Sequence, residues 1–212
     1  RAQAPLVLQM NRAQAQTSDA TATNGPARVN LGSGDSQVPH TGAPNVPVIL
    51  VQYTNIKFKD GENAHTTFED FCNTGDKSVN KYFKDMSLGQ YDPQFKVLGP
   101  YTLSNPRSYY GGNNWAGNDQ RVGEMVKEGC QLAAADPDVD FSIFDNDGDG
   151  KCDVVIVLYA GVGEASSGVR ESVWPCQWSL SNSGAGAYTT DGVQIDKFAV
   201  FNEINGTYQS RI

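Results

Sequence analysis

The chain reads DNDGDGKCDVVIVLY at residues 145–159, an acidic, glycine-containing loop that runs directly into an apolar segment. Carboxylates stand at the first, third, fifth and ninth positions, and Gly150 stands where a tight turn needs a conformation costly for other residues. Ca²⁺ takes about six to eight oxygen ligands, which such a loop can direct at one point. The predicted calcium ligands are Asp145, Asp147, Asp149, Asp153 and the backbone carbonyl of Lys151.

This loop differs from the helix-flanked calcium-binding loop of an EF-hand. An EF-hand loop needs a bidentate Glu at its twelfth position, which here is Ile156. Residues 154–159 are apolar and mostly β-branched, so the loop leads into a buried strand. We therefore expect a short structural calcium site and no sensor. The alternative interpretation is a solvated acidic turn.

Composition limits the class of protein. The 212 residues, 39% of them hydrophobic, suffice for one domain with a tail. The net charge of -8 argues against nucleic-acid binding, and no apolar run is long enough for a membrane span. Residues 1–45 are rich in small and polar residues and are expected to form an extended arm, a linker or a propeptide remnant. The folded domain is expected over residues 46–212.

Strand and helix patterns alternate along the folded domain. The apolar run at 46–53 is typical of a strand buried on both faces. Further strands are expected at 95–98, 101–103, 153–160 and 193–204. Helices are expected from Thr66 or Thr67, over 78–86 and over 119–135, with loops at 107–118 and 161–168. This order predicts an α/β fold, with a mixed, twisted sheet and helices packed on it.

No complete catalytic machinery can be identified from the residues. The glycines of 161–168 have the wrong spacing for a dinucleotide loop, and no Gly-x-Ser-x-Gly elbow is present. His40 and His65 lack partners at metal-ligand spacing and are expected to be exposed loop residues. The residues do not decide whether a cysteine–histidine pair acts as a nucleophile. They also do not decide whether the four cysteines form disulfides or are buried thiols. The cysteines concerned are Cys72, Cys130, Cys152 and Cys176.

An ordered set of segments resembles the N-terminal half of the catalytic domain of immune-inhibitor-A-type zinc metallopeptidases, which are exported bacterial enzymes. Among these peptidases, the sequence is similar to those of the Bacteroides and Prevotella group. The segments are VPVILVQY (46–53), KFKD (57–60), SVNKYFKDMSLGQY (78–91), the 145–153 loop, YAGVGE (159–164), VWPCQW (173–178) and FNE (201–203).

The resemblance implies a zincin-like (metzincin-like) N-terminal subdomain, a zymogen with its arm at 1–45, and a secreted or cell-surface location. It also implies zinc held by a His-Glu-x-x-His helix. That motif is absent before Ile212, so no catalytic residue and no zinc ligand is predicted here, and zinc is expected only in a C-terminal part. Cys176 replaces a histidine of many relatives, which leaves open a structural role or a pairing with Cys130 or Cys152.

The leading hypothesis is a truncated N-terminal fragment of a secreted zinc metalloendopeptidase, inactive alone, whose edge strand binds an extended peptide substrate. A C-terminal companion part or self-association is then expected to cover the apolar faces of strands 46–53 and 153–160. The alternative is a non-enzymatic, calcium-stabilised surface module for binding or adhesion on a degenerate protease scaffold.

Overall fold

The computed structural model describes residues 38–205 and 210–211. Its main sheet has the strand order β2-β1-β4-β8-β5, and β9 pairs with the end of β8. The first four of these strands are parallel, whereas β5 and β9 run antiparallel to β8. The strands are β1 (Asn45–Gln52), β2 (Gln94–Thr102), β4 (Val155–Val162), β5 (Cys176–Ser179), β8 (Lys197–Asn205) and β9 (Ser210–Arg211). This mixed sheet confirms the predicted α/β class.

A small second sheet and several helices complete the described part. The small sheet has the order β3-β7-β6, formed by β3 (Lys151–Cys152), β6 (Tyr188–Thr190) and β7 (Val193–Ile195). The longer helices are α2 (Ala64–Glu69), α3 (Val79–Met86) and α5 (Val122–Ala134). Short helical segments are η2 (Gly61–Asn63), η3 (Asp70–Thr74), α4 (Arg107–Gly111), η4 (Phe141–Phe144) and α6 (Glu164–Ser167). None of the described helices is long and apolar enough to cross a membrane.

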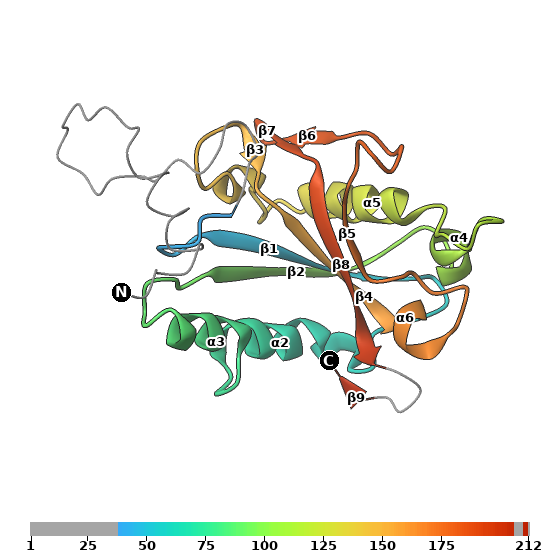
Figure 1. Cartoon of the computed structure of the whole chain (residues 1–212), viewed down its shortest axis with the longest axis horizontal. Helices are drawn as coiled ribbons and strands as arrows, with labels where there is room; N and C mark the ends of the chain where they lie inside the picture. Colours follow the sequence, from blue (N-terminus) through green and yellow to red (C-terminus); the bar gives the residue numbers. More distant parts are fainter. Residues whose placement is uncertain (1–37, 206–209, 212) are drawn as a thin grey trace, which may run out of the picture. The chain divides into compact units, whose positions relative to one another are not determined.

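Apolar side chains pack on both faces of the sheet. Ile49 and Val51 of β1 pack toward α5 in one core, and Val48 and Leu50 pack toward α2 in the other. Figure 1 shows α5 on one side of β1 and β2, and α2 and α3 on the other. The continuous apolar run of β1 follows from this arrangement, because a strand covered on both faces has no solvent side.

Several predicted boundaries are corrected. The helix expected from Thr66 or Thr67 begins at Ala64. Residues 94–102 form one strand, and its register against β1 shifts near Gly99-Pro100 instead of breaking there. The loops expected at 107–118 and 161–168 contain α4 and α6. The run at 193–204 divides at Asp196 into β7 and β8, which belong to different sheets.

The expectation of uncovered strand faces is only half correct. Residues 46–51 of β1 are all buried within the chain, because α2 and its neighbours cover the second face. On β4, by contrast, Ile156 and Leu158 are only partly buried. Leu158 lies opposite Phe201 of β8, whose side chain is 46% exposed. The partly uncovered apolar surface therefore lies on β4 and β8. The expected arm lies, up to residue 37, outside the described residues.

Candidate functional site

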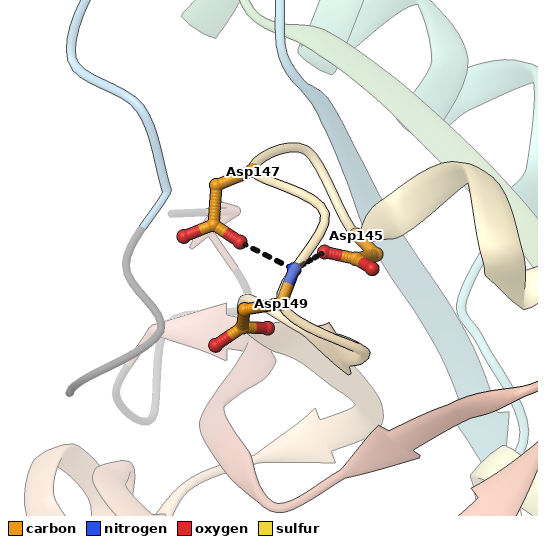
Figure 2. Close-up of side chains that lie close together, drawn as sticks. All are labelled: Asp145, Asp147 and Asp149. Carbon is orange, nitrogen blue, oxygen red and sulfur yellow. Dashed lines mark hydrogen bonds between the residues drawn. The ribbon is translucent and has the colours of Figure 1, made fainter. Parts of the chain in front are cut away.

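The acidic loop between η4 and β3 brings three of the predicted ligands together. One carboxylate oxygen from each of Asp145, Asp147 and Asp149 lies within 4.8 Å of the others (Figure 2). Asp145 organises the turn, since its Oδ1 accepts the N–H groups of Gly148 at 2.8 Å and Asp149 at 3.0 Å. Its Oδ2 accepts the N–H of Gly150 at 2.9 Å. The tight turn expected at Gly150 is confirmed by its φ of 83°.

The charge of this loop suits a hard cation. The only described ion pair of the three carboxylates joins Asp149 Oδ2 to Lys151 Nζ at 3.6 Å. Asp147 and Asp149 are exposed and Asp145 is partly buried, so a cation would reach them directly from solvent. Carboxylate oxygens on a flexible turn are the ligands that Ca²⁺ prefers. The three residues therefore fit a calcium ion.

The other two predicted ligands are placed differently. Asp153 is buried and does not join the group of three; its Oδ2 accepts a hydrogen bond from Asn146 Nδ2 at 2.7 Å. Lys151 begins β3, and its N–H donates to Asp149 Oδ1 at 2.9 Å. Sequence reasoning gave no role to Asn146, which hydrogen-bonds both to Asp153 and to the backbone of Asn45. A local pattern carries no signal for these contacts.

One edge of the main sheet, at β5, carries backbone groups that pair with no other strand in the described part of the chain. Leu180 N–H donates to Asp196 O at 2.8 Å, opposite the end of β8. Backbone groups alternate in direction along an antiparallel strand, so those of Trp178 and Cys176 also point at β8. The N–H and C=O of Gln177 therefore point away from the sheet. Trp178, on this edge, is 43% exposed.

The opposite edge, on β2, is capped by side chains. Asn73 Nδ2 donates to Phe95 O at 2.7 Å, and Phe95 N–H donates to Asn73 Oδ1 at 3.2 Å. His65 Nε2 lies 3.0 Å from Val97 O, so it donates to that carbonyl. His65, expected in a loop, is thus an exposed residue of α2 that caps the sheet. Capping of this kind blocks pairing with another strand.

The cysteines are four separate thiols in this structure. Burial raises the pKa of Cys72 and of Cys152 to about 12 and that of Cys176 to about 11. Burial also raises the pKa of Cys130. A nucleophilic cysteine needs a lowered pKa, because the thiolate is the reactive form. None of these thiols has the environment of a nucleophile.

The described residues do not fit zinc. Within residues 38–205, the acidic loop is the only group of three or more His, Cys, Asp or Glu side chains with metal-ligand spacing. It consists of carboxylates alone, whereas a zinc site of the His-Glu-x-x-His class uses imidazole nitrogens. His40 and His65 are the only histidines in the sequence.

Comparison of the sequence with known proteins shows similarity to peptidases. The profile of the family described as "Immune inhibitor A peptidase M6, catalytic domain" matches residues 42–202. Pre-pro-metalloprotease PrtV of Vibrio cholerae is 26% identical over 145 residues, which cover 60% of this chain and 15% of that protein. Immune inhibitor A of Bacillus thuringiensis is 24% identical over 209 residues, which cover 80% of this chain and 29% of that protein. The chain spans less than a third of the length of these relatives.

Proposed function

Because the chain belongs to the immune inhibitor A (M6) peptidase family, we propose that it forms part of the catalytic domain of a secreted bacterial zinc metalloendopeptidase. The described residues would contribute a wall that binds the substrate. Zinc, which in metalloproteases activates water for peptide-bond hydrolysis, would be held by another part of the same protein. The chain of 212 residues alone would then be inactive.

The open edge at β5 supports this proposal most directly. An extended peptide can add to a sheet wherever a strand presents unpaired N–H and C=O groups, and its main chain supplies most of the affinity. Gln177 presents both groups, while Asn73 and His65 cap the opposite edge at β2. A protein that left both edges open would risk pairing with itself. With the β2 edge capped, the β5 edge is the place where an extended peptide would add to the main sheet.

The acidic loop is proposed to bind a structural calcium ion. Asp145, Asp147 and Asp149 would supply carboxylate oxygens, and the carbonyl of Lys151 would supply a fourth ligand. Asp153 would not bind the ion. Its Oδ2 would instead keep the Asn146 side chain in place through their hydrogen bond of 2.7 Å. The ion would fix the turn that precedes β3 and β4, because the loop runs directly into both strands.

A companion part of the same protein is the proposed cover for the exposed apolar surface. Tyr82 and Met86 of α3 are 60% and 69% exposed, although their spacing gives the helix an apolar face. Leu158 and Phe201 leave further apolar area on the main sheet. Apolar surface of this kind usually marks an interaction site. The alternative is that a second copy of the chain covers this surface by self-association.

A calcium-stabilised binding module is the second candidate. The complete burial of residues 46–51 within the chain favours it, since that strand needs no partner to cover it. On this hypothesis the open edge at β5 would bind peptides without cleaving them. Both hypotheses include the calcium loop and the peptide-binding edge at β5. They differ in that only the enzyme binds a zinc ion.

The test compares the whole gene product with the chain of 212 residues. Metal content is measured by elemental analysis, and cleavage by a fluorogenic peptide library. We expect the whole protein to bind zinc and cleave peptides, and the shorter chain to do neither. Zinc-dependent cleavage by the shorter chain would contradict the proposed division of labour. A whole protein that binds calcium and no zinc would move the function to the binding module.

A further inference from the structure

Two segments that carry oxygen-bearing side chains meet beyond the end of β4. One loop joins α4 to α5 and carries Asn113 and Asp119, which pair through an isolated β-bridge. The other loop runs from Glu164 to Trp174 and leads into β5. Asn113 Nδ2 donates to Glu164 Oε1 at 2.9 Å, and Trp174 N–H donates to Asp119 Oδ2 at 2.6 Å. These contacts hold the two loops together.

Three oxygens in this region are enclosed and lack a hydrogen-bond partner among the described residues. They are Asn113 Oδ1, Asp119 Oδ1 and Ser172 Oγ. Ser172 is completely buried. The amide of Asn113 cannot simply be turned over, because its Nδ2 contacts both oxygens of Glu164 at 2.9 and 3.2 Å. Turning it would place oxygen against a carboxylate. Buried polar atoms without partners are costly and uncommon, so a ligand is indicated.

The charges point to a positive ligand. No lysine or arginine forms an ion pair with Asp119 or Glu164 among the residues that the structure describes. Asp119 and Glu164 are both partly buried, and both are linked to Asn113, by a β-bridge and by a hydrogen bond. Burial and a neighbouring like charge each disfavour a pair of ionised carboxylates. A cation between the loops would remove this penalty and satisfy the acceptors.

We propose that Asn113, Asp119 and Glu164 bind a hard divalent cation of the Ca²⁺ class at the junction of these two loops. The ligands would be an amide carbonyl and two carboxylates. Such an all-oxygen set suits Ca²⁺ and does not suit zinc or copper. This site is separate from the acidic loop at Asp145–Asp149 and does not depend on the peptidase proposal.

The site would act on the sheet edge through Trp174. Its N–H contacts Asp119, and β5 begins two residues later at Cys176. Gly111 lets the two segments approach closely, because a Cβ at this position would lie 2.5 Å from the backbone carbonyl carbon of Ser172. A cation held here would therefore set where the open edge strand begins.

The test uses Tb³⁺ and Ca²⁺ as probes on a variant without the acidic-loop site. Asp147→Asn and Asp149→Asn are combined to remove that site. Trp115 and Trp174 lie in the two loops of the proposed site, whereas residues 145–153 contain no tryptophan. Because the acidic-loop site is removed, Tb³⁺ emission excited through tryptophan reports binding outside that loop. We expect saturable emission that Ca²⁺ displaces, and one bound Ca²⁺ by calorimetry.

Asp119→Ala and Asn113→Ala are the test substitutions in this background. Each removes a ligand, so we expect Ca²⁺ affinity to fall about tenfold or more. Asp76→Ala removes an exposed carboxylate elsewhere and should leave the affinity unchanged. If Asp119→Ala fails to fold, Glu164→Gln tests the same ligand set with less disturbance. A folded background variant without Ca²⁺ binding, or unchanged affinity after these substitutions, would overturn the proposal and leave water as the partner of the buried oxygens.

Discussion

The side-chain amide of Asn146 hydrogen-bonds in both directions to the backbone of Asn45. Asn45 N–H donates to Asn146 Oδ1 at 2.8 Å, and Asn146 Nδ2 donates to Asn45 O at 3.0 Å. This pair imitates the hydrogen bonding of a neighbouring strand at the first residue of β1. The same Nδ2 also donates to the buried Asp153. The acidic loop is therefore attached to the main sheet by the residue between its first two carboxylates.

Asn146→Ala should lower the free energy of unfolding by about 1–3 kcal/mol, because it leaves a backbone donor and the buried Asp153 carboxylate without this partner. Urea denaturation measures this change. Asn182→Ala is the control, since Asn182 is exposed and its side chain makes no hydrogen bond to another described residue. An equal effect of both substitutions would show that Asn146 has no special role.

Replacing Asp147 and Asp149 by alanine should remove the acidic loop's share of the dependence of Tm on calcium, leaving only the share of the site proposed at Asn113, Asp119 and Glu164. A ligand bound only by the folded state stabilises that state by mass action, so the wild-type Tm should rise with Ca²⁺ and fall with chelator. Thermal melts with EGTA and with increasing Ca²⁺ measure the effect. Asp76→Ala, outside the loop, should keep the wild-type response. A wild-type melting curve that ignores both calcium and chelator would mean that neither proposed calcium site stabilises the fold.

Sequence patterns predicted what local chemistry determines. The apolar run of β1, the helix over 78–86 and the turn at Gly150 each depend on a few adjacent residues, and the structure confirms them. The break at Asp196 was missed because the apolar pattern continues through it. It is set by distant contacts, since Leu180 and Ser181 donate to the Asp196 carbonyl and carboxylate.

The candidate site divides in the same way. Asp145, Asp147 and Asp149 converge because alternate positions of one short turn face inward. Asp153 is drawn away by Asn146, whose other partner is 101 residues distant in sequence. The capping of β2 by Asn73 and His65 likewise depends on long-range pairing. No spacing rule within a single sequence encodes such contacts.

Asn73→Ala should uncap the β2 edge. Phe95 would lose the partners of both its N–H and its C=O, so we expect a loss of about 1–3 kcal/mol in unfolding free energy. The freed edge should also make the protein associate at high concentration, because an exposed strand edge pairs with other chains. Sedimentation velocity measures the association. Thr74→Ala removes only an exposed contact with Asp70 and should leave the protein unchanged. Unchanged stability in Asn73→Ala would argue against the cap.

Cys176 should react slowly with alkylating reagents at neutral pH. Burial, and then the nearby Asp119 carboxylate, raises the pKa of its thiol from 9.0 to about 11. The rate should therefore increase as pH rises toward 11, and an exposed Ser181→Cys thiol should react faster throughout. Peptide mapping after timed iodoacetamide treatment measures both rates.

The same pKa shift has a consequence for stability. The unfolded chain ionises this thiol near pH 9, whereas the folded chain keeps its proton up to about pH 11. Its contribution to stability is complete below pH 9 and is lost as pH rises from 9 to 11. Cys176→Ser should reduce that part of the alkaline loss in urea denaturation. Rapid alkylation of Cys176 at pH 7 would contradict both expectations.

Gln177→Pro should weaken peptide cleavage by the whole protein without unfolding it. The N–H of Gln177 points away from the sheet, so proline removes no hydrogen bond between β5 and β8, and proline is tolerated at such edge positions. If a substrate carbonyl accepts from this N–H, its loss should lower kcat/KM about 3- to 10-fold. Gln177→Ala keeps the N–H and removes the side chain, so it should lose less activity. Zinc content and Tm of both variants, measured beside kcat/KM, exclude a general loss of structure. Equal activity in both variants would mean that the substrate does not pair with this edge.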